Sequence, residues 1–151
     1  MIRAGNISDI DSILNVTKSC ALYMIDNEIY QWNETYPDRK SFLNDVKNKE
    51  LYVYCEKDKV IACISLCNKM DKVYEQVSWN TENKNNLYIH RLAVHPDFQK
   101  KGVGKSLMDY AEGFAKKHNY VSVRLDTFSQ NKRNLKFYES RDYNRFCLLY
   151  T

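Results

Sequence analysis

A glycine-containing stretch ahead of an expected helix constrains this chain most. Residues 99–106 read QKKGVGKS and hold two of the four glycines among 151 residues. A chain that uses glycine so sparingly is expected to place two together where the backbone needs a positive φ or must approach a ligand closely. The stretch follows a β-rich run closed by His95-Pro96 and precedes an amphipathic run up to Lys117. Strand, glycine loop and helix in that order predict a cup of backbone N–H groups suited to a diphosphate.

Three phosphate-binding patterns share parts of this stretch. The Walker A pattern, G-x-x-x-x-G-K-[ST], fits at Gly104-Lys105-Ser106 but meets Gln99 in place of its first glycine. The dinucleotide fingerprint, G-x-G-x-x-G, begins at Gly102 and is broken by Leu107. The pattern Q/R-x-x-G-x-G/A is matched in full by Gln99, Gly102 and Gly104. Because this pattern is short, its neighbours must decide between a binding loop and a plain basic turn.

Composition is that of an ordinary folded chain, with 44% hydrophobic and 28% charged residues. The length is most simply one domain over residues 1–151. No apolar run approaches the roughly 18 residues of a membrane span, and residues 1–11 carry no apolar stretch of signal-peptide type. We therefore expect a cytoplasmic protein without a membrane partner.

Charge and cysteine content narrow the function further. The net charge of +4 does not call for a nucleic-acid partner. The five cysteines include no C-x-x-C pair, which is typical of reduced thiols and predicts neither a disulfide framework nor a metal site.

The hydrophobic pattern predicts a mixed α/β (α+β) domain. One helix is expected to begin at Ser8, with Asp11 completing a capping box, and a second to begin at Pro37-Asp38. Residues 68–86 form a long polar loop, which in a compact domain is usually functional or contains a small strand. The remaining elements expected are helices over 104–117 and 131–140, and strands over 2–3, 51–55, 60–66, 87–94, 121–127 and 143–150. Hairpins followed by strand-helix-strand favour a mixed sheet covered by helices.

Two motifs resemble the GCN5-related N-acetyltransferase (GNAT) family. The first is LAVHPDFQKKGVGKSLMDYAE at residues 92–112, and the second is LDTFSQNKRNLKFYESRDY at residues 125–143. They follow the family patterns L-A-V-x-P-x-x-Q/R-x-x-G-x-G and N-x-x-(A)-x-x-F-Y-E-x-x-G-F, in order and at the family's spacing. The late glycine is replaced by Asp142, which tolerates left-handed backbone. The resemblance implies a mixed, mostly antiparallel twisted sheet flanked by helices and an acetyl-CoA-dependent N-acetyltransferase.

The resemblance also implies residue roles. The backbone of the 92–94 strand would pair with the pantetheine arm of acetyl-CoA, backbone amides from Lys100 to Lys105 would hold the pyrophosphate, and Asn131 would hydrogen-bond the pantetheine arm. Tyr138 would protonate the departing thiolate, a contribution of roughly 10²- to 10⁴-fold for a general acid. The cofactor-binding residues expected are Leu92, Ala93, Val94, Gln99, Lys100, Lys101, Gly102, Val103, Gly104, Lys105 and Asn131.

The general base has several candidates. An alkylammonium with a pKa of about 10.4 is mostly charged at pH 7, so the acceptor amine must lose a proton before it attacks. His90 has a suitable intrinsic pKa of about 6.5, and strand alternation would place it on one face with Tyr88 and Leu92. Asp126 at the end of the next strand, or ordered water alone, is the alternative.

The acceptor side carries weaker signals. Residues 28–39, EIYQWNETYPDR, resemble a Gln-Trp-containing region in some bacterial family members. Trp32, Tyr36 and Trp79 are expected to line an acceptor pocket, with simple packing as the alternative. Glu28 and Glu34 would favour a cationic amine. The expected partner is a small-molecule or peptide amine, and the aromatic C-terminal strand could pair across a homodimer.

Direct transfer in a ternary complex is expected, because Cys63 and Cys67 lie outside both motifs and have no adjacent histidine. An alternative from another class is a non-catalytic acyl-CoA-binding sensor or interaction domain on the same fold. A nucleotide or nucleic-acid binder built on Lys100, Lys101 and Lys105 is a further alternative, against which the missing Walker glycine and the modest charge both count.

Overall fold

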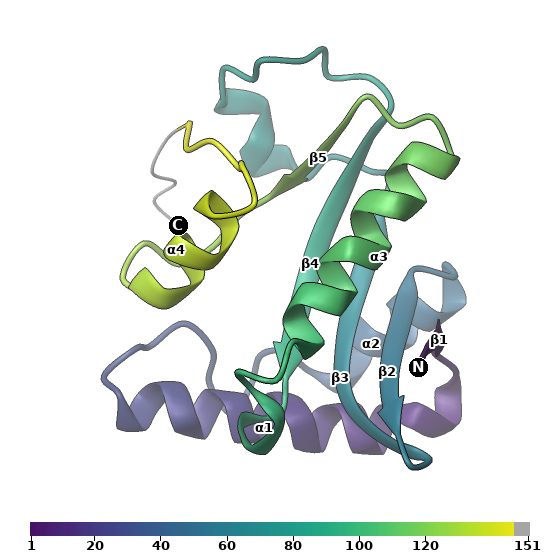
Figure 1. Ribbon diagram of the computed structural model, residues 1–151, viewed down its shortest axis with the longest axis vertical. Coiled ribbons are helices and arrows are strands. Elements are labelled where there is room, and N and C mark those ends of the chain that lie inside the picture. The colour runs from purple at the N-terminus through teal and green to yellow at the C-terminus, as the bar shows by residue number, and fades with distance from the viewer. Residues whose placement is uncertain (147–151) are drawn as a thin grey trace.

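The described part of the chain, residues 1–146 of the computed structural model, contains a five-stranded sheet with helices on both faces (Figure 1). The strands are β1 (Ile2–Ala4), β2 (Leu51–Glu56), β3 (Lys59–Cys67), β4 (Asn86–Val94) and β5 (Ser122–Leu125). The helices are α1 (Ile10–Asp26), α2 (Arg39–Lys47), α3 (Val103–Lys117) and α4 (Lys132–Glu139). The sheet order is β1-β2-β3-β4-β5, antiparallel except for the parallel β4–β5 pair. The predicted mixed, mostly antiparallel sheet flanked by helices is confirmed.

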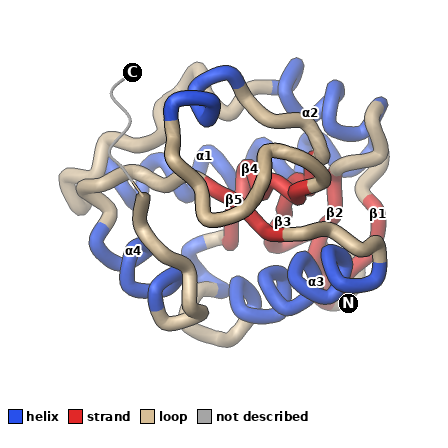
Figure 2. The backbone as a smooth tube through the Cα atoms, turned by 90° about the horizontal axis from the view of Figure 1, so that it is seen from above, coloured by secondary structure: helices blue, strands red, loops and turns tan. Residues whose placement is uncertain are grey.

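Helix α3 covers one face of the sheet, and α1 and α2 cover the other (Figure 2). The central strand β3 supplies side chains to both apolar clusters. On the α3 side Ile64 packs with Leu107 and Met108, and on the other side Cys63 packs with Ile13. A strand buried on both faces reads as a nearly continuous apolar run. Because both faces of the sheet are filled, its accessible backbone lies at the edges and strand ends.

The first helical segment begins two residues earlier than predicted. Asn6, not Ser8, is its N-cap, and the Asn6 side chain accepts a hydrogen bond from the backbone N–H of Ser8 at 3.0 Å. The Asp9 carboxylate accepts from the backbone N–H of Asn6 at 2.9 Å, which completes the capping box. The second predicted start is confirmed, because Asp38 caps α2 through the N–H of Ser41 at 2.9 Å.

Strand β4 pairs with β5 over its first part only. The parallel pairing joins Asn86–Ile89 to Ser122–Leu125. Beyond Ile89, β4 continues to Val94 alongside β3, while β5 leads away toward α4 (Figure 1). Among the described strands, none pairs with the outer edge of residues 90–94.

One additional residue in β4 accompanies this divergence. Cys63 of β3 faces Ala93, but Ser65 faces His90, so two steps along β3 correspond to three along β4. The additional residue is a β-bulge at Arg91, whose φ is 50°.

The bulge reverses the side-chain alternation that the sequence predicted. Leu92 packs with Leu87 and Ile89 in the apolar cluster under α3, on the face opposite to His90. The expected common face of Tyr88, His90 and Leu92 is therefore wrong at Leu92, because strand alternation does not continue through a bulge.

The expected C-terminal strand, residues 143–150, is not found in the part that the structure describes. Tyr143–Phe146 has no strand conformation, and residues 147–150 lie outside the described residues. Within residues 1–146, no helix is long and apolar enough to cross a membrane.

A buried arginine anchors the long loop over residues 68–85. Arg124 of β5 is only 3% exposed, and its guanidinium lies 4.3 Å from the ring of Trp79. No carboxylate is among its described partners, so neutral groups alone solvate the charge. Its acceptors in the loop include Thr81 O and Thr81 Oγ1, both at 2.9 Å, Glu82 O at 3.0 Å and Asn83 Oδ1 at 2.8 Å.

We expect Arg124→Met to destabilise the protein by about 2–4 kcal/mol, because it leaves several loop acceptors without a donor. Urea denaturation measures the change. The control is Arg39→Met, which removes an exposed ion pair to Asp11 and should cost less than about 1 kcal/mol. Equal losses in the two variants would contradict this account of the loop.

Candidate active site

The residues before α3 form a cup of backbone N–H groups. Backbone N–H groups from Lys100 to Lys105 have no acceptor among the described residues, and the next one, on Ser106, donates to Gly102 O at 3.0 Å. Lys100 and Gly102 have left-handed backbone, with φ of 62° and 83°. Unpaired N–H groups at a helix N-terminus carry partial positive charge and bind phosphate groups. The side chains of Lys100, Lys101 and Lys105 are exposed around this cup.

The two glycines of the cup differ in whether the backbone requires glycine. Gly102 needs its positive φ, as the sequence predicted. Gly104 does not have a positive φ, and a Cβ atom there would lie 3.8 Å from both the Phe137 ring and Val94 Cγ2, which is ordinary contact. Gly104 is therefore replaceable by alanine without strain.

The end of β4 presents backbone groups beside the cup. The N–H of His95 donates to Ile61 O at 2.9 Å, whereas Val94 faces Ala62 as the next pair. Hydrogen-bonded and non-hydrogen-bonded pairs alternate in antiparallel ladders, so the N–H and C=O of Val94 point away from β3 toward the open edge. The side chains of Leu92 and Ala93 are packed in the two apolar clusters, and Ala93 is paired with Cys63 of β3.

Gln99 links the end of β4 to helix α4. Its Nε2 donates to Val94 O at 2.9 Å, and its Oε1 accepts from Arg133 Nη1 at 2.8 Å. The side chain of this motif residue thus connects the strand that precedes the cup to helix α4.

Asn131 and Tyr138 are both on or beside α4. Asn131 is the N-cap, accepting from the N–H of Asn134 at 3.2 Å, and its amide donates to Gln31 Oε1 at 3.1 Å. Tyr138 is 9% exposed, and its hydroxyl has no hydrogen-bond partner within residues 1–146. Burial, and then the negative charge of Asp126, raise the pKa of Tyr138, so its phenol keeps its proton at neutral pH.

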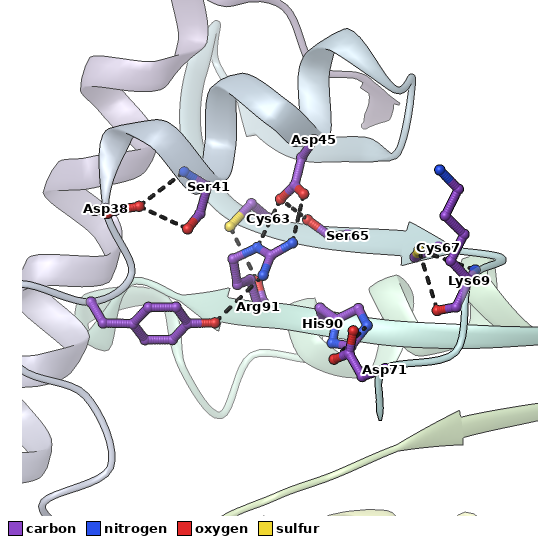
Figure 3. Close-up of polar contacts among 11 residues, drawn as sticks. Asp38, Ser41, Asp45, Cys63, Ser65, Cys67, Lys69, Asp71, His90 and Arg91 are labelled. Carbon is purple, nitrogen blue, oxygen red and sulfur yellow. Dashed lines mark hydrogen bonds and ion pairs between the residues drawn. The ribbon is translucent and has the colours of Figure 1, made fainter. Parts of the chain in front are cut away.

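His90 lies among charged groups on the strand beside the bulge. Its imidazole Nε2 is 3.9 Å from Asp71 Oδ2, and 14% of its side chain is exposed (Figure 3). Burial lowers the pKa of His90 below its usual value and outweighs the opposing effect of the surrounding carboxylates, so the imidazole is neutral at pH 7. The charged groups that act on it are Asp71, Arg91, Asp126 and Asp45.

Asp126, the other predicted base, is already engaged. It is exposed and accepts a hydrogen bond from the hydroxyl of Tyr74, a side chain that is 1% exposed. Burial, and then the charge of Asp126, raise the pKa of Tyr74, so its phenol keeps its proton and remains the donor of this hydrogen bond. Asp126 therefore ties the loop over residues 68–85 to the end of β5.

The aromatic residues expected around the acceptor do not form one cluster. Trp79 donates from Nε1 to Tyr74 O at 3.0 Å and stacks on Arg124, which makes it a packing residue of the loop. Trp32 packs against the apolar cluster beside α1. Tyr36 is 43% exposed, and its hydroxyl lies 3.4 Å from Arg91 Nη1. Within the described residues, no ring contact joins these three side chains.

The sequence reasoning missed a buried ion pair between Arg91 and Asp45. Arg91 Nε and Nη2 donate to the two carboxylate oxygens of Asp45 at 2.8 and 2.6 Å (Figure 3). The sequence signals are a charged residue inside the apolar run 87–94 and an aspartate on the side of α2 that also carries Phe42, since both Phe42 and Asp45 are buried. Neither signal names its partner. Within residues 1–146, no group of His, Cys, Asp and Glu side chains is arranged to hold a metal ion.

The sequence model of the Acetyltransferase (GNAT) family matches residues 15–143. The chain belongs to this family. An uncharacterized N-acetyltransferase of Bacillus subtilis, YesJ, is 22% identical over 89% of this chain and 76% of its own length. The enzyme class of this GNAT protein is accordingly that of the N-acetyltransferases, which are acyltransferases and act on an acceptor substrate.

Solved structures agree with the GNAT assignment. A candidate acetyltransferase from Staphylococcus aureus Mu50 is 27% identical, with a TM-score of 0.75 over 93% of this chain and 89% of that one. The PaiA N-acetyltransferase of Thermoplasma acidophilum, solved in complex with coenzyme A, is 19% identical, with a TM-score of 0.70 over 93% of this chain and 87% of that one. The five-stranded mixed sheet flanked by helices therefore matches the fold of GNAT structures.

We expect the two glycines of the cup to respond oppositely to alanine. Gly102→Ala should destabilise the protein by about 1–2 kcal/mol, because a Cβ atom is strained at positive φ. Gly104→Ala should be neutral or stabilising by up to about 1 kcal/mol, because it restricts the unfolded chain and favours helix. Urea denaturation of the two variants measures both changes, and a stabilising Gly102→Ala would refute the assigned backbone geometry.

Proposed function

We propose that this protein transfers an acetyl group from acetyl-CoA to a primary amine of a small molecule or peptide, by direct attack in a ternary complex. The observation that carries the proposal is the unpaired N–H row from Lys100 to Lys105, placed directly after the open edge of β4. A diphosphate in the cup would lie at the end of a strand whose Val94 backbone still points outward. That arrangement suits a cofactor with a pyrophosphate and an extended amide-containing arm, and the coenzyme A complex of PaiA supports it.

The proposed cofactor path runs from the cup along β4. Backbone N–H groups of the cup hold the pyrophosphate, with Lys100 and Lys101 adding positive charge at its rim. The outward N–H of Val94 is the free strand donor for the pantetheine arm, since Val94 O already accepts from Gln99. Asn131 is the proposed contact from the start of α4, through the second N–H of its amide, since the first donates to Gln31 Oε1.

The chemical step needs two proton transfers. The neutral His90 imidazole is the proposed acceptor of the ammonium proton, directly or through water, and burial suits it to that role by lowering its pKa. Tyr138 is the proposed donor to the departing coenzyme A thiolate. Its hydroxyl keeps its proton and has no competing acceptor within residues 1–146. Backbone N–H groups near the bulge would stabilise the oxyanion.

The test compares the Tyr138→Phe variant with the wild type on a panel of primary amines. The release of coenzyme A measures the rate of acetyl transfer. We expect kcat to fall by about 10²- to 10⁴-fold, because only the general acid is removed. The dissociation constant for acetyl-CoA should stay unchanged in calorimetric titration. The matched control is Tyr143→Phe, which also removes a tyrosine hydroxyl. That hydroxyl donates to Glu112 Oε1 of α3 at 3.4 Å and has no proposed part in the reaction.

An unchanged kcat in Tyr138→Phe would contradict the acid role. Acetyl-CoA binding by the wild type without turnover of any amine would contradict the enzyme proposal. It would favour the acyl-CoA-binding sensor instead.

A further inference from the structure

Arg91 has a backbone conformation that is unusual for a residue with a large side chain. Its φ of 50° is in the left-handed region, where a Cβ atom is disfavoured and glycine or asparagine is usual. Non-glycine residues persist in such conformations when their surroundings hold them, often beside functional sites. The contacts of the Arg91 side chain are therefore expected to hold the bulge in this conformation.

The guanidinium of Arg91 binds Asp45 of α2 in a nearly buried bidentate pair. The two contacts measure 2.8 and 2.6 Å, and the side chains are 16% and 4% exposed. Ser65 of β3 donates to the same carboxylate at 2.5 Å (Figure 3). A planar fork that meets both carboxylate oxygens fixes direction as well as distance, which a lysine cannot reproduce. The pair thus locks the bulge of β4 to α2 and β3.

The same guanidinium reaches the segment between α1 and α2. Its Nη1 lies 3.4 Å from the Tyr36 hydroxyl. That segment also contains Gln31, whose side chain accepts from the Asn131 amide at 3.1 Å, so it spans from the bulge to the start of α4. The two sequence neighbours of Arg91 are His90, the proposed base, and Leu92, at the start of the proposed cofactor-binding backbone.

We propose that Arg91 is a positioning residue for acetyl transfer. Its guanidinium donates two hydrogen bonds to Asp45 and a third to Tyr36. These contacts fix the bulge between His90 and Leu92 relative to the segment between α1 and α2. The inference rests on the proposed function. Misplacement of reacting groups by about 1 Å costs about 10²-fold in rate, so the guanidinium acts on kcat more than on cofactor affinity.

The decisive variant is Arg91→Gly combined with Asp45→Asn. Glycine accepts the positive φ without strain, and the asparagine avoids leaving a buried carboxylate without a counter-ion. Per folded molecule, kcat should fall about 10- to 100-fold, while the acetyl-CoA dissociation constant changes less than about threefold. Arg91→Lys, which keeps the charge but loses the fork, should recover part of kcat. Tyr36→Phe, which removes only the contact at 3.4 Å, should lower kcat by a smaller factor.

The matched control removes another bidentate pair, far from the cup in sequence. Arg3 Nη1 and Nη2 donate to the carboxylate of Asp9, both at 2.8 Å. Arg3→Met combined with Asp9→Asn should lower stability but leave kcat per folded molecule unchanged.

A kcat within twofold of wild type in the folded Arg91→Gly/Asp45→Asn protein would overturn the inference, as would a loss of acetyl-CoA affinity equal to the loss in kcat. If that variant does not fold, Arg91→Lys and Tyr36→Phe decide, and unchanged kinetics in both would overturn it.

A readout without an acceptor separates this inference from the proposed function. The amide signals of His90 and Leu92 in the acetyl-CoA complex should be sharp in the wild type and broadened in the variants, and unbroadened signals would contradict the positioning role.

Discussion

One additional residue in β4 creates the geometry on which the proposed chemistry depends. The bulge at Arg91 coincides with the point where β5 leaves β4, so the strand continues with an open backbone edge. An open edge is costly in most proteins because it leaves hydrogen-bonding groups unpaired. Here that edge ends beside the cup of unpaired N–H groups from Lys100 to Lys105, and one extended ligand can satisfy both.

Burial sets the protonation states that the proposed reaction needs. The Tyr138 phenol is desolvated and lies near the charge of Asp126, so its pKa rises and it keeps its proton. The His90 imidazole is also desolvated, so its pKa falls and it is ready to accept one. The same physical cause thus acts on the proposed acid and on the proposed base, because burial disfavours the charged form of each group.

The sequence predicted what depends on local pattern and missed what depends on distant partners. Glycine scarcity and the spacing around Gln99 located the cup, and β-rich runs bounded by polar turns located β2, β3 and β4. The bulge at Arg91 was missed, because its ion-pair partner Asp45 lies 46 residues away and no local pattern encodes that pairing. The predicted role of Trp79 in an acceptor pocket did not take Arg124 into account. The buried guanidinium of Arg124 packs against the Trp79 ring.

The most direct measurement is a two-dimensional ¹⁵N NMR titration with acetyl-CoA, repeated with ATP. The account predicts large shifts for the amides of Lys100 to Lys105 and of Val94 with acetyl-CoA, whereas the hairpin turn at Lys57 and Asp58 stays unperturbed. ATP should perturb the cup weakly and leave Val94 unchanged, because it has no arm to follow the strand. Saturable acetyl-CoA binding that leaves residues 100–105 unshifted would contradict the assignment of the cup.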